Sequence, residues 1–420
     1  MYRGDWLLRL PALSRDARNP LRWRVGANVW ALGVTSLLTD ISSEMVVSIL
    51  PAYLVMTGGL APLALGIATG LHEGGPLFAA WAGGLIADRS GRRKLTAGLG
   101  YGVSAISRLG WLLLSSRSMS AVAGLVLSDR FGKAIRTAPR DAVISLSAAP
   151  DQLATAFGVH RALDAAGAAL GPVLAFVVLR QLPHRYDVVF FTSFVVSLLG
   201  VLALVLLVTE PVDRATIAAG VRERRSDAFA VFADAPARRV LALAAAFGLV
   251  TIGDAFVYLL LVKRSQAGPE WIPLLYTATA VAFLVLAIPV GYAADRIGRR
   301  SVFVFGHGFL VLSYAAAFSR FPVWPWNALV CVASLGAFSA ASDGVLPSLA
   351  GGLLPANTRA LGLAWVATAA SAARLCSAIV FGWLWTRAGE RFAVLTFSVA
   401  LLAVVCGAAS ARTLETSVNG

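Results

Sequence analysis

The stretch GLIADRSGRR at residues 84–93 recurs as GYAADRIGRR at residues 291–300. Both copies follow a long apolar run and present two glycines, one aspartate and three arginines in the same order. Self-similarity between two halves of a chain is the pattern that duplication of a structural unit leaves. We therefore expect two halves with the same helical plan, each with this charged loop between two apolar segments.

The rest of the chain has the composition of a membrane protein. Of its 420 residues, 58% are hydrophobic and 14% are charged, and the mean hydropathy is +0.75. The apolar runs are about 20 residues long, which is the length of helix that crosses a hydrocarbon layer of roughly 30 Å. We expect an all-α membrane protein with twelve spans, at residues 27–56, 62–86, 95–115, 119–143, 155–179, 187–208, 239–262, 271–293, 301–319, 324–346, 360–385 and 391–410.

The loops predict the orientation of these spans. Lys and Arg concentrate in the connections that share a side with the two termini, and this bias predicts that both termini are cytoplasmic. The net charge of +14 is thus explained by basic loops on the cytoplasmic side of the membrane, and we expect no nucleic-acid partner. The domains predicted are a cytoplasmic tail (1–26), a six-helix bundle (27–208), a cytoplasmic central loop (209–238), a second six-helix bundle (239–411) and a cytoplasmic tail (412–420).

The doubled GxxxDRxGRR stretch resembles the loop motif of the major facilitator superfamily. The resemblance implies two pseudo-symmetric bundles around a central cavity that opens alternately to either side. Aspartate at a helix start, beside arginines, would act as a cytoplasmic latch; the alternative is that the arginines only set orientation. The matching gate residues are Gly84, Asp88, Arg89, Gly91 and Arg92 in the first copy and Gly291, Asp295, Arg296, Gly298 and Arg299 in the second.

A second motif lies in the fifth predicted span. Gly158, Gly167, Gly171 and Pro172 follow the spacing Gx8Gx3GP, which resembles a motif on the fifth helix of bacterial drug/proton antiporters of the same superfamily. The resemblance implies export in exchange for protons. The alternative is ordinary packing, since small residues at this spacing form a flat helix face.

Ionisable residues inside the spans are the candidate site residues. Each costs at least roughly 2.5–3.5 kcal/mol at the bilayer centre, so a lipid-facing position is disfavoured. We expect the following residues to line a proton or substrate cavity: Asp40, Glu44, Glu73, Arg108, Asp129, Arg130, Asp254 and Arg374.

The first span gives the sharpest pattern. Ser36, Asp40, Ser43, Glu44 and Ser48 recur at steps of four and three, which predicts one polar stripe on an apolar helix. Desolvation favours the protonated form of a carboxylic acid, so such a stripe suits proton uptake and release. The alternative is that Asp40 or Glu44 is a static partner of Arg108, Arg130 or Arg374. Asp343 is expected in the cytoplasmic charge cluster.

The function expected is efflux of a small organic molecule (a drug, a toxic compound or a secreted metabolite) across the bacterial inner membrane. The proton gradient would drive it, with no cofactor and no metal site, and the protein would be a monomer in the lipid bilayer. An uptake symporter or uniporter, or a transport-inactive sensor or partner subunit, remains an alternative. An enzyme is not expected, because the chain shows no nucleophile–base pair, metal-ligand spacing or phosphate loop.

Overall fold

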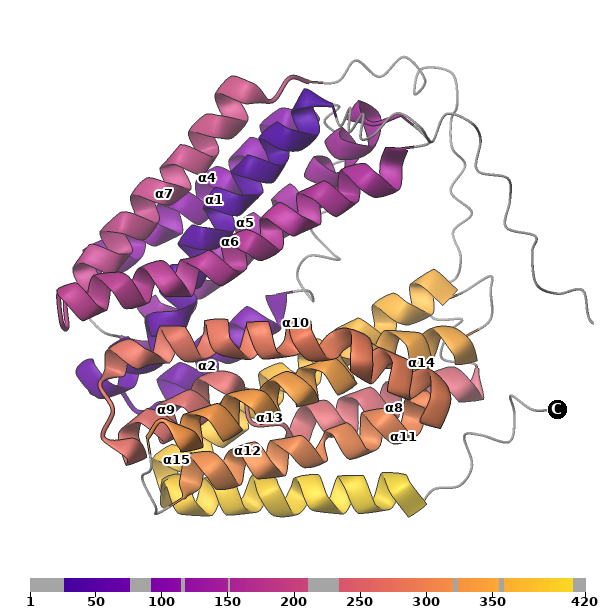
Figure 1. The fold of residues 1–420 in the computed structure, drawn as a ribbon. Coiled ribbons are helices and arrows are strands. Elements are labelled where there is room, and N and C mark those ends of the chain that lie inside the picture. Colours follow the sequence, from indigo (N-terminus) through magenta and orange to yellow (C-terminus); the bar gives the residue numbers. More distant parts are fainter. Residues whose placement is uncertain are drawn as a thin grey trace, which may run out of the picture.

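The computed structural model describes residues 26–75, 92–114, 118–149, 152–210, 234–319, 324–354 and 359–410. These residues form helices and turns, and they contain no strand (Figure 1). Several predictions fall on other residues. Gly84, Asp88, Arg89 and Gly91 of the first loop motif, most of the central loop, most of the N-terminal tail and all of the C-terminal tail lie outside the described residues.

The first half of the chain begins with a long apolar helix that contains the predicted polar stripe. Its last turn continues as a short wider helix, η2. The helices of this half are α1 (Ala27–Pro51), η2 (Ala52–Thr57), α2 (Pro62–Glu73), α4 (Arg93–Leu113), α5 (Met119–Ser147), α6 (Leu153–Gln181) and α7 (Tyr186–Leu207).

The second half has more interrupted helices. Its elements are α8 (Ala235–Val250), α9 (Asp254–Ser265), η5 (Pro269–Trp271), α10 (Ile272–Ile297), α11 (Arg299–Gly306), α12 (Gly308–Phe318), α13 (Trp326–Ser342), α14 (Val345–Leu353) and α15 (Arg359–Ser410). The last of these is two helices joined at Gly389, whose φ of 86° lies in the left-handed region that glycine adopts without strain.

Each of the twelve predicted spans contains a described helix. Eight helical segments among the described residues are long and apolar enough to cross a membrane, with the two helices of α15 counted as one segment. The shorter described helix α2 and the charged helices α4 and α5 are not among these segments. The fold is therefore that of an all-helical membrane protein, and the count of twelve spans stays a prediction.

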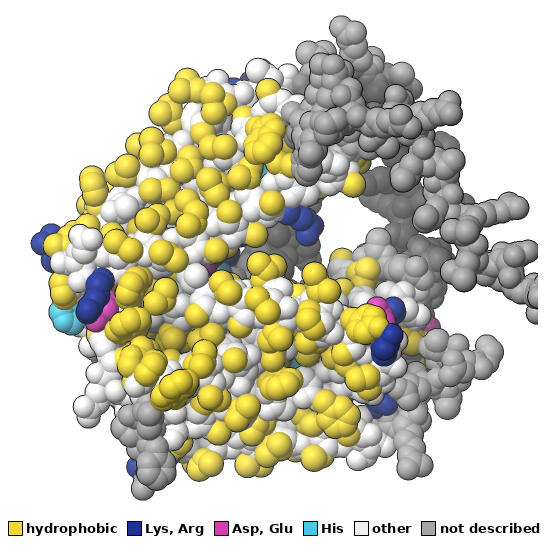
Figure 2. Space-filling view, viewed as in Figure 1, with side chains coloured by type: hydrophobic (Ala, Val, Ile, Leu, Met, Phe, Trp, Pro, Cys, Tyr) yellow, Lys and Arg dark blue, Asp and Glu magenta, His cyan; other side chains and the backbone are white. Residues whose placement is uncertain are grey.

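The two halves pack against each other through a few helices. Figure 1 shows α1, α4, α5, α6 and α7 as one group and the helices from α8 onward as another, with α2 lying against the second group. Contacts between α2 and α15 and between α6 and α10 join the groups. On the face shown in Figure 2, hydrophobic side chains cover much of the surface of both groups. Ile288 of α10, for example, is 83% exposed. Such a surface suits a protein surrounded by lipid.

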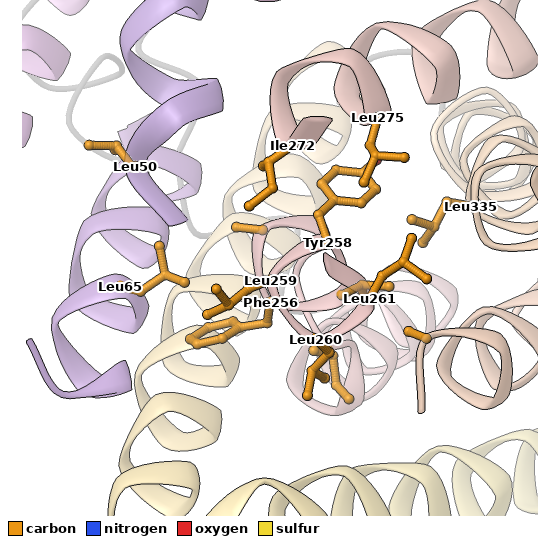
Figure 3. Close-up of a cluster of buried hydrophobic side chains, with 14 of the residues drawn as sticks. Leu50, Leu65, Phe256, Tyr258, Leu259, Leu260, Leu261, Ile272, Leu275 and Leu335 are labelled. Carbon is orange, nitrogen blue, oxygen red and sulfur yellow. The ribbon is translucent and has the colours of Figure 1, made fainter. Parts of the chain in front are cut away.

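Helix α9 is buried among other helices of the second group. Phe256, Tyr258, Leu259 and Leu260 are buried on different sides of it (Figure 3). A helix that is apolar all round is buried on all sides. This packing fixes the position of α9, and with it the position of Asp254 at its first turn.

Candidate functional site

Two adjoining cavities lie between the halves. The larger has a volume of about 610 Å³ and the smaller about 210 Å³. Figure 2 shows the hollow between the two helix groups, with basic side chains facing it. Of the residues that the structure describes, four line both cavities and so mark where they meet: His72, Glu73, Asp343 and Arg374.

The smaller cavity gathers carboxylates from both halves of the chain. Glu44 of α1 and Glu73 of α2 face it from the first half. Asp254 of α9 and Asp343, which follows α13, face it from the second. Four acidic groups from four parts of the chain therefore converge on one small chamber.

A break in the seventh predicted span places Asp254 there. Helix α8 ends at Val250 and α9 begins at Asp254, so residues 251–253 are not helical. The freed backbone groups find partners: the Ile252 N–H donates to Tyr314 Oη at 2.8 Å, and Ser377 Oγ donates to the Thr251 carbonyl at 2.5 Å. Non-helical backbone at membrane depth is tolerated where it lines a cavity. The start of α9 also favours a carboxylate, because the helix dipole is positive at that end.

Arg374 of α15 brings a guanidinium to the smaller cavity. It donates to Asp343 at 3.1 Å. It also interacts electrostatically with Glu73 and Asp254. The single positive charge of Arg374 therefore interacts with three carboxylates, so acidic groups outnumber it in this part of the site.

A separate charge network lies inside the first half. Asp129 of α5 accepts from Arg108 of α4 at 2.6 Å and from its neighbour Arg130 at 2.5 Å, and all three side chains are buried. Ser43 of α1 accepts from both arginines. Asp129 is thus the ion-pair partner of both arginines in this structure. Arg130 lines the larger cavity, whereas Arg108 and Asp129 lie outside the lining of both cavities.

The two carboxylates of the first-span stripe lie in different surroundings. Glu44 faces the smaller cavity. Asp40 is buried and lies 4.0 Å from both Lys133 and Arg136 of α5, and Ser36, one turn before it on α1, donates to Asp164 of α6. The stripe on α1 is therefore divided between the cavity and the interface with α5 and α6.

The α6 glycines explain this close interface. A Cβ at Gly167 would lie 2.5 Å from the Leu37 carbonyl oxygen, and one at Gly171 would lie 2.5 Å from that of Ile41. Gly158 has no neighbouring atom within 4 Å of its Cβ position. Two of the three glycines therefore allow α1 and α6 to approach closely, beside Asp40 and Glu44.

The second loop motif joins three helices. Arg299 at the start of α11 pairs with Asp295 of α10 at 3.1 Å and donates to the Ser348 carbonyl of α14. Gly298 between them has a φ of 106°, and Arg296 lies over the ring of Tyr292. The remaining motif glycine, Gly291, has open space at its Cβ position.

The last residues of the first loop motif are described, and there the start of α4 is capped by the carboxylate of Glu210. Arg92 precedes α4, and the first backbone N–H groups of that helix, at Arg93 and Lys94, donate to Glu210 at 2.9 and 2.8 Å. A carboxylate at this position satisfies free N–H groups and complements the helix dipole.

The sequence missed some residues of the site. Asp343, expected in the cytoplasmic charge cluster, lines both cavities. The signal available was Arg374, since an arginine within a span requires an acidic partner. His72 and Lys133 line the larger cavity as well. Among the described residues, no group of three or more His, Cys, Asp or Glu could hold a metal ion.

Comparisons with known proteins agree with this architecture. The family model described as the Major Facilitator Superfamily matches residues 32–272 and 261–417. An uncharacterized MFS-type transporter of Methanocaldococcus jannaschii is 29% identical over 394 residues, covering 90% of this chain and 93% of that protein. An uncharacterized protein of Mycobacterium tuberculosis is 26% identical over 414 residues, covering 96% of each.

Solved structures show the same fold. The nucleoside transporter NupG superposes with a TM-score of 0.76 at 14% identity, covering 91% of this chain and 98% of that one. An inward-facing bacterial homolog of the human lysosomal transporter Spinster gives a TM-score of 0.70 at 15% identity, covering 90% and 95%. Because the family model spans nearly the whole chain, this protein belongs to the Major Facilitator Superfamily and is a membrane transporter.

Proposed function

We propose that this transporter exports a small organic molecule across the bacterial inner membrane in exchange for protons, with both termini in the cytoplasm. The observation that carries the proposal is the convergence of Glu44, Glu73 and Asp254 on one chamber between the halves. Carboxylates removed from bulk water are the groups that bind and release protons during alternating access.

The surroundings of these carboxylates support proton exchange. Among the described residues, none of the three has a Lys, Arg or His nitrogen within 4.0 Å, and Arg374 is hydrogen-bonded to Asp343 instead. A carboxylate without a tight ion pair is free to change its protonation state. Asp129 is the opposite case, since two arginines hold it.

The packing of α6 supports coupling between movement of the halves and the carboxylates of α1. Gly167 and Gly171 belong to the antiporter-like motif and contact α1 beside Asp40 and Glu44. Helix α6 also packs against α10 of the other half. A movement of one half against the other would therefore be passed through α6 to the helix that carries these two carboxylates.

The experiment begins with a growth screen. A strain that lacks the transporter is compared with its parent on a panel of toxic compounds, and accumulation of each hit is measured in cells. Efflux predicts higher accumulation in the deletion strain, whereas uptake predicts lower accumulation and would overturn the direction.

Coupling is then tested in inverted vesicles with an imposed pH gradient. Uptake of the hit should follow the gradient in the parent protein and be lost in Glu73→Gln and Asp254→Asn. The control is Asp187→Asn, because Asp187 forms an exposed pair with Arg185 at the end of α7 remote from the cavities. Gradient-driven transport at the parent rate in both cavity variants would sink the proposal.

A further inference from the structure

Helix α5 presents a basic face to the larger cavity. Arg130, Lys133, Ala134 and Thr137 line it from this helix. Steps of three and four residues place them on one face, with the two cations in adjacent turns. This wall of the cavity is therefore positively charged.

Lys133 is the accessible cation of this wall. The Arg130 side chain is 8% exposed and is held by Asp129, whereas the Lys133 side chain is 43% exposed. Among the described residues, one carboxylate lies within 4.0 Å of Lys133, and that carboxylate, Asp40, lies at the limit of this distance. A separation of 4.0 Å is too long for a hydrogen bond, and Glu44 and Asp164 act on Lys133 only from further away.

The same cavity also has acidic lining residues. Glu73 and Asp343 line the larger cavity together with the α5 residues, and Asp254 lines the adjoining smaller one. Arg374 is the guanidinium among them and is already bonded to Asp343. The lining of this cavity therefore includes an accessible cation, Lys133, and a carboxylate, Glu73, that forms no close ion pair among the described residues.

Much of the remaining lining of the larger cavity is apolar. Leu346, Pro347, Ala367 and Ala370 contribute to it. The cavity volume of about 610 Å³ falls within the range of roughly 300–1,000 Å³ that small-molecule sites occupy. The site suits a compact apolar body with a charged group at each end.

We infer that the substrate is amphoteric: Lys133 binds its acid group and Glu73 binds its protonated amine. This rests on the proposed function only in taking the cavity as the transport path. A purely cationic molecule would bring no acid group to Lys133, and a purely anionic one would bring no amine to Glu73. The substrate amine would also replace a proton at Glu73, which is the competition that exchange requires.

Binding to the purified full-length protein in detergent tests this without any proton gradient. The probes share one skeleton: ε-aminocaproate, aminohexyl phosphate, caproate and n-hexylamine. Their dissociation constants are obtained from the concentration dependence of thermal stabilisation. An amphoteric probe can pair with Lys133 through its acid group and with Glu73 through its amine, whereas caproate and hexylamine can each form only one of these pairs. At least one amphoteric probe should therefore bind roughly tenfold or more tightly than caproate and hexylamine, as one additional charged hydrogen bond predicts.

Variants identify the residues. In Lys133→Gln, the better amphoteric probe should bind no more tightly than hexylamine, and Lys133→Arg should restore part of the difference. Lys263→Gln is the matched control, because Lys263 pairs with Glu390 away from both cavities. Comparison of ε-aminocaproate with aminohexyl phosphate identifies the acid group of the substrate: the probe that binds more tightly carries the preferred group, carboxylate or phosphate.

Three results would overturn the inference: no binding of either amphoteric probe, binding of caproate or hexylamine as tight as that of both amphoteric probes, or an unchanged preference in Lys133→Gln. Failure of proton coupling alone would affect only the proposed function, because these binding measurements are made at one pH without a membrane.

Discussion

Asp129 is the anion that two buried arginines share. Arg108 and Arg130 both bond to it, and neither side chain is more than 8% exposed. Removing one partner from a buried ion pair leaves an uncompensated charge and costs about 3–5 kcal/mol. The stability of the first half should therefore depend on this one carboxylate.

Asp129→Asn should lower the thermal unfolding temperature of the purified protein well below that of Asp187→Asn. The control removes an exposed pair, and such pairs contribute about 0–1 kcal/mol. Unfolding in detergent, followed by intrinsic tryptophan fluorescence, measures both variants. Equal unfolding temperatures would contradict the structural role given to Asp129.

The sequence predicted which residues share a helix face, but it did not predict which residues of other helices lie next to them. The spacing of Asp40 and Glu44 predicts that they share a helix face. It does not say which helix covers each turn of that face, and the structure places Asp40 beside α5 and α6 but Glu44 on the cavity. Spatial pairs such as Arg374 with Asp343 arise only from tertiary packing.

At the scale of the element, the α1–α6 contact depends on two backbones that approach without intervening side chains. Gly171→Ala would place a methyl group 2.5 Å from the Ile41 carbonyl oxygen and 2.9 Å from Glu44 Cβ. The helices must separate or Glu44 must move, and overpacking of this kind costs about 1–3 kcal/mol.

We expect Gly171→Ala to lower both thermal stability and the rate of transport. Gly158→Ala provides the matched control on the same helix, because its Cβ position is open and alanine favours a helix over glycine by about 1 kcal/mol. Stability and transport are measured on both variants. If Gly171→Ala matched Gly158→Ala in both, the close contact would have no role.

Helices could be predicted from the sequence better than their interruptions. Apolar length located a helix in every predicted span. The break at residues 251–253 was not predicted, because the apolar run continues through it and its partners, Tyr314 and Ser377, come from distant helices. Most of the first loop motif lies outside the described residues, so the latch role of Asp88 stays a prediction.

At the scale of the molecule, the halves are held together at the end where α6 meets η5. Arg180 of α6 lies 3.8 Å from Glu270 of η5. Phe176 packs against Trp271 with ring centroids 5.2 Å apart, and the Leu63 N–H donates to Thr386 Oγ1 at 3.1 Å. Alternating access requires contacts of this kind to separate when the cavity opens at that end.

A cross-link between Phe176→Cys and Trp271→Cys should therefore stop transport reversibly. The exposed native cysteines, Cys376 and Cys406, are first replaced by serine. A short cleavable thiol cross-linker should abolish transport of the screened compound, and cleavage should restore it, whereas either single cysteine should be unaffected. Normal transport by the cross-linked protein would show that this end need not open.

The central claim is that substrate and proton compete for carboxylates of one cavity, and proton release on binding tests it most directly. The compound found by the screen is added to purified protein in weak buffer with a pH indicator. The account predicts that the parent protein releases protons and that Glu73→Gln releases fewer at equal occupancy. Unchanged pH in the parent, or equal release from the variant, would contradict it.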